Sequence, residues 1–271
     1  MSSSTKKTFS THAPAKLNIT LKVGPKDDTG YHEITSVMQT VAHSYRITLR
    51  PVTEGEERIT GCGNVHKILR KAVDEMAAFT NMKLFCDITI PETLLLGAGM
   101  GVDSSLAAAT LRLANAAYDL RLSQNELHVI AANVGNDVQF AVYGGRATVW
   151  GTKIHTVRPE TIPPLFYVIA KPKNVFLQTP TQYKLLDETG RSLAQLACDA
   201  SPITKQLMDT TIGWEEEHGV TGKGPTVFWG YRRLDESAEL QRRIQKIDGI
   251  MVLAAQPITL EGISTDSLEW S

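Results

Sequence analysis

Residues 94–109 read LLLGAGMGVDSSLAAA, in which three glycines at alternate positions precede two serines and a run of alanines. Glycine has no Cβ, so it accepts positive φ angles and lets a ligand approach the backbone closely. The alternation in residues 84–90 predicts a strand before this loop, and the alanines predict a buried helix after it, over residues 107–120. Ser104 and Ser105 can cap that helix, whose first N–H groups favour an anion. The stretch therefore predicts a strand, a loop and a helix that hold a phosphate group.

Two common phosphate-binding motifs are excluded at this loop. It has no Gly-Lys-Ser/Thr and so is not a Walker A loop, and its Gly-x-Gly-x-Gly spacing differs from the dinucleotide pattern Gly-x-Gly-x-x-Gly. Because glycine-rich loops are common, the same residues are also compatible with a plain turn before a buried helix. The loop alone leaves both interpretations open.

The composition is typical of a globular protein with one large or two moderate domains: 271 residues, 42% hydrophobic and 21% charged. A net charge of −1 argues against a general nucleic-acid binder. The three cysteines are widely spaced and form no Cys-x-x-Cys. This spacing indicates a reducing compartment rather than a disulfide framework or a cysteine zinc site.

No apolar run approaches the roughly 18 to 20 residues that a membrane helix needs. Residues 1–8 have no apolar segment behind their lysines, so we expect a short disordered tail and not a secretory signal. We therefore expect a soluble, cytoplasmic protein with neither nucleic acid nor a membrane as a partner.

Residues 16–23 alternate strictly between polar and apolar side chains, which predicts a strand with one buried face. A turn-rich segment follows at residues 24–30. Further strands are expected at residues 38–41, 45–49, 140–142 and 147–149, and further helices at residues 65–79 and 125–134. Together these elements form the first part of the chain.

Pro159, Pro163 and Pro164 mark a boundary, so we expect domains at residues 1–158 and 159–271. The second part is expected to contain strands at residues 165–170, 226–229 and 250–254, and helices at residues 181–186, 192–207 and 235–245. Strands and helices alternate irregularly along the chain. This pattern favours an α+β fold over a doubly wound sheet.

Four polar groups stand out against these elements. Lys16 and Asn18 share one strand face, which is either its solvent side or part of a site. Tyr31-His32-Glu33 follows a flexible turn and suits a flat ring that is stacked and hydrogen-bonded, although an ordinary turn exit has the same residues.

The other two groups follow glycines. In Gly135-Asn136-Asp137 a carboxylate lies between a helix and an apolar segment that we expect to be a strand. A half-buried aspartate needs a partner, for which Lys16 is a candidate; otherwise Gly135 ends the helix and Asp137 faces solvent. Residues 222–226, GKGPT, form either a second backbone surface opposite the first loop or only a tight turn.

Taken in order, five motifs resemble the GHMP kinases: PAKLNITL at residues 14–21, GYHE at 30–33, the glycine loop with its Ser-Ser-x-Ala-Ala-Ala continuation, Gly135-x-Asp137-Val138, and GKGPTVF at 222–228. The resemblance covers most of the chain. The first two motifs are most similar to members of the family that act on 4-diphosphocytidyl-2-C-methyl-D-erythritol.

The resemblance implies a two-domain α+β GHMP kinase fold with the active site in the cleft between the domains. The N-terminal domain would be like ribosomal protein S5 domain 2, and the C-terminal domain ferredoxin-like. It also implies phosphorylation of the substrate's 2-hydroxyl with ATP and Mg²⁺, in the non-mevalonate pathway to isoprenoid precursors, by a monomer or weak homodimer. Two alternatives stay open: a GHMP kinase acting on another small alcohol, and a catalytically inactive nucleotide-binding relative.

The family's functional residues map onto this chain by motif position. Asp137 matches the catalytic base, and Lys16 the lysine that contacts it and the accepting hydroxyl. The resemblance assigns ATP to Gly97, Ala98, Gly99, Met100, Gly101, Asp103, Ser104 and Ser105. It assigns the substrate to Asn18, Tyr31, His32, Thr179 and Tyr183, with the cytosine stacked between the two tyrosines and its edge read by His32. It assigns no protein ligand to a metal.

The chain departs from the family pattern mainly in the glycine loop. Val102 and Asp103 stand where glycines are usual, and Leu106 where the family has an aspartate. Thr89 stands where a lysine commonly precedes Ile-Pro, and Lys223 replaces a small serine, adding a cation that can partly replace the missing one. These changes bear on ATP binding more than on substrate recognition. They favour the inactive alternative, whereas the retained Lys16 and Asp137 oppose it.

Overall fold

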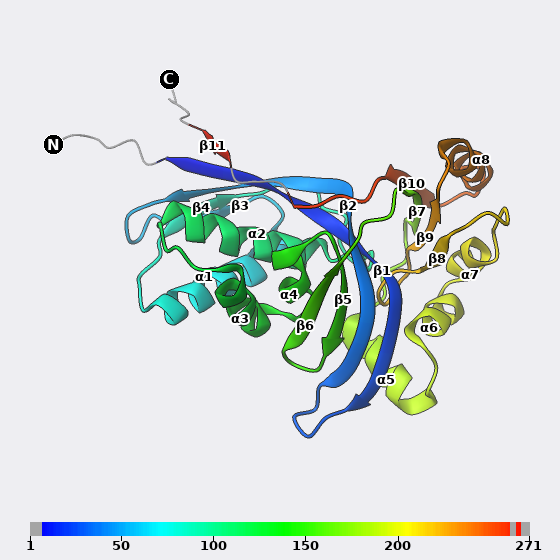
Figure 1. The fold of residues 1–271 in the computed structure, drawn as a ribbon, viewed down its shortest axis with the longest axis horizontal. Coiled ribbons are helices and arrows are strands. Elements are labelled where there is room, and N and C mark those ends of the chain that lie inside the picture. Colours follow the sequence, from blue (N-terminus) through cyan, green and yellow to red (C-terminus); the bar gives the residue numbers. More distant parts are fainter. Residues whose placement is uncertain (1–6, 261–263, 267–271) are drawn as a thin grey trace.

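The computed structural model describes residues 7–260 and 264–266 (Figure 1), so the tail expected before residue 7 lies outside the described residues. Among the described residues, seven strands form one sheet and four form another. No helix in these residues is both long enough and apolar enough to cross a membrane.

The larger sheet is built on a long antiparallel hairpin of β1 and β2. Its strands are β1 (Thr8–Lys26), β2 (His32–Pro51), β3 (Ile59–Thr60), β4 (Cys86–Thr89), β5 (Arg146–Gly151), β6 (His155–Glu160) and β11 (Ser264–Asp266). Their order is β11-β1-β2-β4-β3, with β5 on β2 and β6 on β5. The strands expected separately at 38–41 and 45–49 are one strand, β2, because pairing with β1 continues across residues 44 and 45.

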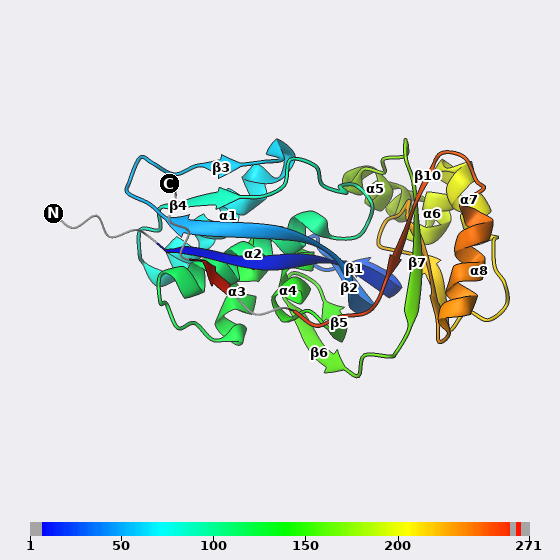
Figure 2. The ribbon, with the colours of Figure 1, turned by 90° about the horizontal axis from the view of Figure 1, so that it is seen from above.

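Helices cover one face of this sheet (Figures 1 and 2). They are α1 (His66–Thr80), α2 (Val102–Ala117), α3 (Gln124–Val134) and α4 (Asn136–Tyr143), with a short 3-10 turn at Gly63–Val65. The alanine-rich helix α2 is buried nearly all round, as its sequence predicts, and packs on β1 and β2. It begins at Val102, earlier than expected, with Gly101 as its N-cap. The expected cap by Ser104 or Ser105 is therefore wrong, since both lie inside the helix.

The expected strand at residues 140–142 is also wrong, because these residues belong to α4. A short apolar run does not distinguish a buried helix from a buried strand. Here the run packs against α2 and α3 in helical form. Gly135 separates α3 from α4, so Asp137 lies in the first turn of a helix and not ahead of a strand.

The second sheet contains β7 (Phe166–Pro172), β8 (Glu217–Val220), β9 (Val227–Tyr231) and β10 (Ile250–Ala255), all antiparallel to their neighbours. Its helices are α5 (Thr179–Thr189), α6 (Leu193–Ala200), α7 (Pro202–Met208) and α8 (Leu234–Ile244). The element order βαββαβ with strand order β10-β7-β9-β8 is the ferredoxin-like arrangement.

The single helix expected at residues 192–207 is two helices, α6 and α7. Ser201 has an extended conformation, as expected for a residue before proline, and its side chain caps α7 by accepting from the Thr204 N–H. The expected division after residue 158 falls inside β6, because pairing with β5 continues to Glu160. The exact limits of the two domains stay a prediction.

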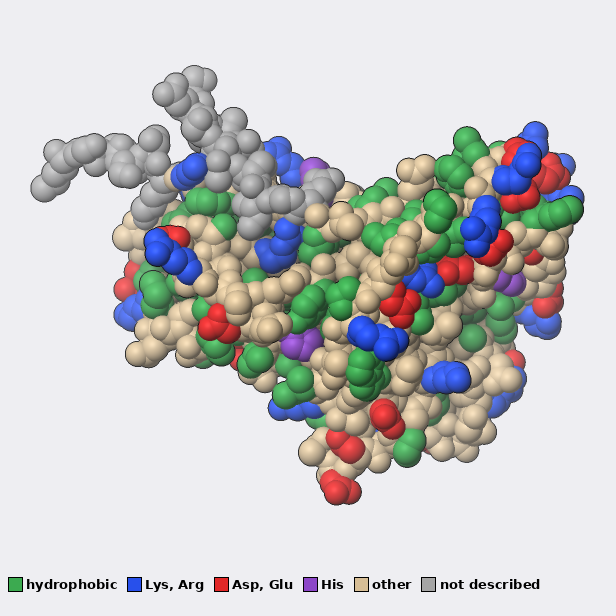
Figure 3. Space-filling view, in the orientation of Figure 1, with side chains coloured by type: hydrophobic (Ala, Val, Ile, Leu, Met, Phe, Trp, Pro, Cys, Tyr) green, Lys and Arg blue, Asp and Glu red, His purple; other side chains and the backbone are tan. Residues whose placement is uncertain are grey.

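On the face shown in Figure 3, acidic and basic side chains are mixed. Over α8 they form ion pairs, in which Glu239 binds both Arg242 and Arg243. The described residues on this face therefore do not form a charged patch of one sign.

Candidate active site

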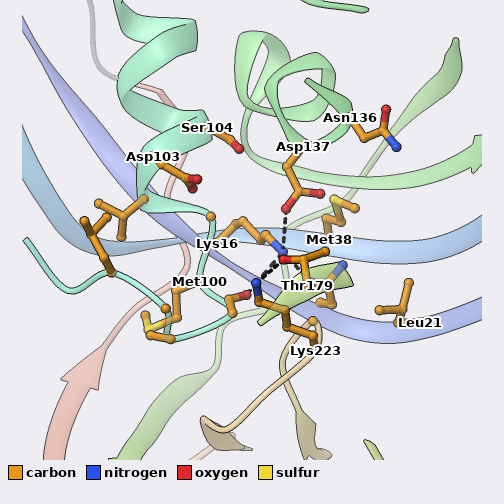
Figure 4. Close-up of a pocket in the computed structure, with 18 of the residues that line it drawn as sticks. Lys16, Leu21, Met38, Met100, Asp103, Ser104, Asn136, Asp137, Thr179 and Lys223 are labelled. Carbon is orange, nitrogen blue, oxygen red and sulfur yellow. Dashed lines mark hydrogen bonds and ion pairs between the residues drawn. The ribbon is translucent and has the colours of Figure 1, made fainter. Parts of the chain in front are cut away.

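A cavity of about 420 Å³ lies between the part of the chain that contains the larger sheet and the part that contains the second sheet. The helical side of the first part provides the glycine loop and Asp137, and β1 provides Lys16 and Asn18. The second part provides residues from α5 and from the loop between β8 and β9: Thr179, Tyr183, Gly222 and Lys223. Figure 4 shows side chains from both parts pointing into the same space.

Lys16 and Asp137 form an ion pair in this cavity (Figure 4). Lys16 Nζ lies 3.2 Å from Asp137 Oδ2, and it also donates to Gly99 O at 3.3 Å and to Asn18 Oδ1. Lys16 is 5% exposed and Asn18 is 3% exposed. These two residues therefore do not form a solvent face of β1, and Asp137 has the partner that the sequence suggested.

Asn18 is fixed by two residues that sequence reasoning missed. Its N–H donates to Thr221 Oγ1 at 2.9 Å, and its Nδ2 donates to Ser36 Oγ at 2.9 Å. The Thr221 hydroxyl in turn donates to Gly99 O at 3.3 Å. Thr221 thus ties β1 to the glycine loop and to the β8–β9 loop. The only signal for it was its position directly before the GKGPT motif.

The glycine loop requires glycine where it meets these neighbours. Gly99 has φ +73°, and a Cβ there would lie 2.2 Å from Thr221 O. Gly101 has φ +61°, and a Cβ there would lie 2.8 Å from Lys16 Cε. The Gly101 N-cap provides no side-chain hydrogen bond to the first turn of α2. N–H groups at this helix start are therefore suited to bind an anion.

Most of the predicted ATP-site residues line the cavity: Gly97, Ala98, Gly99, Met100, Gly101, Asp103 and Ser104. Ser105 differs, because it is buried in α2 and its N–H donates to Gly101 O at 2.9 Å. Its amide is therefore part of the helix and not of the cavity surface.

The predicted substrate residues are only partly brought together. Thr179 and Tyr183 line the cavity, and burial raises the pKa of Tyr183 to about 12, helped by the charge of Asp137. His32 lines an adjoining cavity of about 560 Å³ but reaches Tyr183, with 5.3 Å between the ring centroids. Tyr31 is 41% exposed at the hairpin turn, outside the residues that line either cavity.

Asp187 is a further residue that sequence reasoning missed. Its Oδ1 lies 3.1 Å from His32 Nε2, while its Oδ2 accepts from Lys26 Nζ at 2.5 Å. The other ring nitrogen of His32, Nδ1, lies 2.8 Å from Gly24 O. Asp187 follows Tyr183 by one helical turn of α5, and this spacing was the signal that could have found it.

Among residues 7–260 and 264–266, no three His, Cys, Asp or Glu side chains are grouped to hold a metal. Two carboxylates, Asp103 and Asp137, nevertheless line the cavity. Mg²⁺ at nucleotide sites is usually bound through one or two carboxylates together with substrate phosphates. The donors present therefore fit a magnesium ion that arrives with a nucleotide.

Comparison with known sequences identifies a family for this chain. Residues 64–146 match the family model described as the GHMP kinases N terminal domain. The chain is 30% identical over 250 residues to 4-diphosphocytidyl-2-C-methyl-D-erythritol kinase of Listeria welshimeri, an alignment covering 80% of this chain and 85% of the relative. It is 29% identical over 250 residues to the kinase of the same name from Bacillus cereus, covering 80% and 86%.

Solved structures show the same fold. A crystal structure of 4-(cytidine 5'-diphospho)-2C-methyl-D-erythritol kinase superposes with a TM-score of 0.72 at 20% identity, covering 91% of this chain and 99% of that one. Homoserine kinase from Cytophaga hutchinsonii superposes with a TM-score of 0.70 at 14% identity, covering 98% and 99%. At these identities the structures support the fold and not a particular substrate.

Proposed function

Because this chain belongs to the GHMP kinase family, we propose that it transfers the γ-phosphoryl group of ATP to the 2-hydroxyl of 4-diphosphocytidyl-2-C-methyl-D-erythritol. This reaction is a step of the non-mevalonate pathway to isoprenoid precursors. The observation that carries the kinase chemistry is the Lys16–Asp137 ion pair beside the glycine loop. The choice of acceptor rests on the Listeria and Bacillus relatives, whose names specify it.

Asp137 is proposed as the general base. Its carboxylate takes the proton of the accepting hydroxyl while the hydroxyl oxygen bonds to the γ-phosphorus and the bond from that phosphorus to ADP breaks. The Lys16 ammonium, 3.2 Å from Asp137 Oδ2, orients the carboxylate and contacts the same hydroxyl. Lys16 is itself oriented by Gly99 O and Asn18, which limits the positions its ammonium can take.

The glycine loop is proposed as the site of the ATP phosphates. Residues 97–101 and the first turn of α2 line the cavity with backbone groups, and a helix N-terminus attracts phosphate. Asp103 and Asp137 are the residues that would hold Mg²⁺. When bound, the ion supplies positive charge to the oxygens of the transferred phosphoryl group.

The cytidine part of the substrate is proposed to bind beside α5. Tyr183 offers one ring face. His32, 5.3 Å away between centroids, offers Nε2, which lies near Asp187 but makes no hydrogen bond within the described residues. Tyr31 would cover the other face of the base from the hairpin turn, with Asn18 and Thr179 near the acceptor. Stacking of a base on an aromatic ring contributes about 1–3 kcal/mol.

The test measures ADP release by the purified protein with ATP and Mg²⁺ and one of three acceptors. These are diphosphocytidyl-methylerythritol, methylerythritol phosphate and mevalonate. Turnover with the cytidine compound alone is expected. Turnover with only another alcohol would show that the proposed acceptor is wrong. No turnover with any of the three, together with measurable binding of the cytidine compound, would support an inactive relative.

We further propose the cytoplasm as the compartment and a monomer or weak homodimer as the assembly. Cys62, Cys86 and Cys198 are free thiols, which supports a reducing environment. Sedimentation velocity over a range of protein concentrations tests the assembly, and a stable higher oligomer at low concentration would contradict it.

A further inference from the structure

We propose that Lys223 is an additional catalytic residue, whose ammonium binds the phosphoryl group during transfer and offsets the charge of Asp103 across the cavity. This inference rests on the proposed kinase function but not on the identity of the acceptor. It begins from two residues, Asp103 and Lys223, that both depart from the family pattern and both line the same cavity.

The backbone on either side of Lys223 is held close to the glycine loop. Thr221 Oγ1 donates to Gly99 O at 3.3 Å, and a Cβ added at Gly222 would lie 3.0 Å from that same oxygen. The Gly224 N–H closes a tight turn by donating to Thr221 O at 3.0 Å. The Lys223 side chain therefore starts from a fixed point beside the predicted phosphate site.

The side chain points into the cavity (Figure 4). Its ammonium donates to Thr179 Oγ1, which is a neutral partner, and it points toward Lys16. Among the described residues, no carboxylate lies within ion-pair distance of it. An ammonium has three donors, so Lys223 retains donors for an anionic ligand. Lys16 differs, because it is already paired with Asp137.

The electrostatics of the cavity are consistent with this role. Burial lowers the pKa of Lys223, while the charges of Asp103 and Asp137 act to raise it and that of Lys16 lowers it further. The charges of these three residues thus act on Lys223. Asp103 alone would repel a phosphate at the start of α2, and Lys223 is the cation placed to offset it. Lys223 is half-buried and lacks a carboxylate partner, so a bound phosphate would offset the cost of burying its charge by accepting hydrogen bonds from the ammonium.

Lys223 takes part in none of the bonds that form or break during transfer. The acceptor oxygen bonds to the γ-phosphorus, the bond from phosphorus to the bridging oxygen of ADP breaks, and the hydroxyl proton passes to Asp137. Lys223 keeps its proton throughout and hydrogen-bonds to the oxygens of the phosphoryl group. Such contacts stabilise the charge on the phosphoryl oxygens as transfer proceeds.

The experiment compares ATP and ADP binding by calorimetry in the presence of Mg²⁺ and without an acceptor. For Lys223→Gln we expect ATP affinity to fall by about tenfold while ADP affinity changes by less than about twofold, because only ATP carries the γ-phosphoryl group. Lys223→Arg, which keeps the charge, should retain most of the preference for ATP. Lys246→Gln removes an exposed lysine in the turn after α8, outside the residues that line either cavity, and should change neither affinity.

A second arm tests the coupling to Asp103. Because Asp103 is also a proposed ligand of Mg²⁺, this arm is measured without the ion. Asp103→Asn combined with Lys223→Gln should then bind ATP more tightly than Lys223→Gln alone, because the uncompensated negative charge is gone. Equal losses for ATP and ADP, a loss confined to the cytidine substrate, or no loss in a folded Lys223→Gln variant would each overturn the proposal. If the preference for ATP depends on Lys223 but the cytidine compound is not turned over, the role of Lys223 is supported and only the proposed acceptor is rejected.

Discussion

Lys16 and Asp137 lie 3.2 Å apart, Nζ to Oδ2, although one comes from the first strand and the other from the first turn of α4. The pair exists because α2 and α4 pack together on the helical face of the sheet, so α4 begins next to β1. Lys16 is buried, whereas the Asp137 side chain is 35% exposed toward the cavity. The carboxylate therefore remains accessible to a ligand while its partner is held in place.

We predict that Asp137→Asn lowers kcat by about 10²-fold or more, because general-base catalysis contributes on that order. Binding of the cytidine substrate should stay nearly unchanged, since the amide has the same shape. Steady-state kinetics and calorimetry measure the two effects. Asp248→Asn, a change at an exposed aspartate, is the control. A kcat within a few-fold of the parent enzyme would show that Asp137 is not the base.

Gly99→Ala is predicted to weaken ATP binding and to destabilise the fold. A residue with a Cβ at positive φ costs about 1–2 kcal/mol, and at Gly99 that Cβ would also lie 2.2 Å from Thr221 O. The loop must therefore move away from the β8–β9 loop. Urea unfolding and ATP calorimetry measure the two effects.

Gly55→Ala is the matched control for Gly99→Ala. Gly55 has φ +88° but no atom within 4 Å of an added Cβ, so it isolates the backbone cost. Equal losses of stability in the two variants would mean that the contact with Thr221 contributes nothing.

The glycine loop and the buried helix α2 were predictable because local features encode them. Three glycines and an alanine run are each visible in a short stretch. The pairing of Lys16 with Asp137 was expected from the resemblance to the GHMP kinases, since the residues themselves made Lys16 only a candidate partner. Tertiary packing decided what was missed. Residues 140–142 have a composition that suits either a strand or a helix, and the contacts of α4 with α2 and α3 explain why they are helical.

The contacts that complete the site were beyond sequence patterns for the same reason. Thr221 and Ser36 are ordinary polar residues whose importance comes from reaching Asn18 across the fold. Ser36 has no neighbour in sequence that marks it as part of a site, and Thr221 has only the adjacent GKGPT motif. By contrast, the break between α6 and α7 was visible as Ser201-Pro202, since a residue before proline avoids the helical conformation.

Tyr31→Ala is predicted to weaken binding of the cytidine substrate with little effect on ATP. The loss should be about tenfold, the lower end of what one stacked base contributes. Tyr31 is 41% exposed, so its removal should leave stability unchanged. Tyr183→Ala serves as the comparison, because Tyr183 lines the cavity itself. If calorimetry shows unchanged substrate affinity in Tyr31→Ala and a loss only in Tyr183→Ala, the base stacks on Tyr183 alone.

Asp187→Asn is predicted to lower affinity for the cytidine substrate by a few-fold without affecting ATP. Asp187 links the hairpin to α5 by binding both Lys26 and His32, so its loss frees the imidazole that is proposed to read the base. The pKa of Asp187 is lowered from 3.8, chiefly by the hydrogen bond from Lys26. Because the pKa is lowered, the interactions of the Asp187 carboxylate stabilise the structure fully above pH 3.8. This stabilisation is lost as the pH falls through the lowered pKa.

The difference in affinity for the cytidine substrate between Asp187→Asn and the parent enzyme should therefore persist from about pH 8 to about pH 5. Asp209→Asn is the matched control, since Asp209 forms an exposed ion pair with Lys205 and neither residue lines either cavity. Exposed ion pairs contribute little to stability, so both variants should unfold at nearly the same urea concentration. A loss of substrate affinity in both variants would point to general charge effects, whereas a loss confined to Asp187→Asn would assign it the positioning of His32.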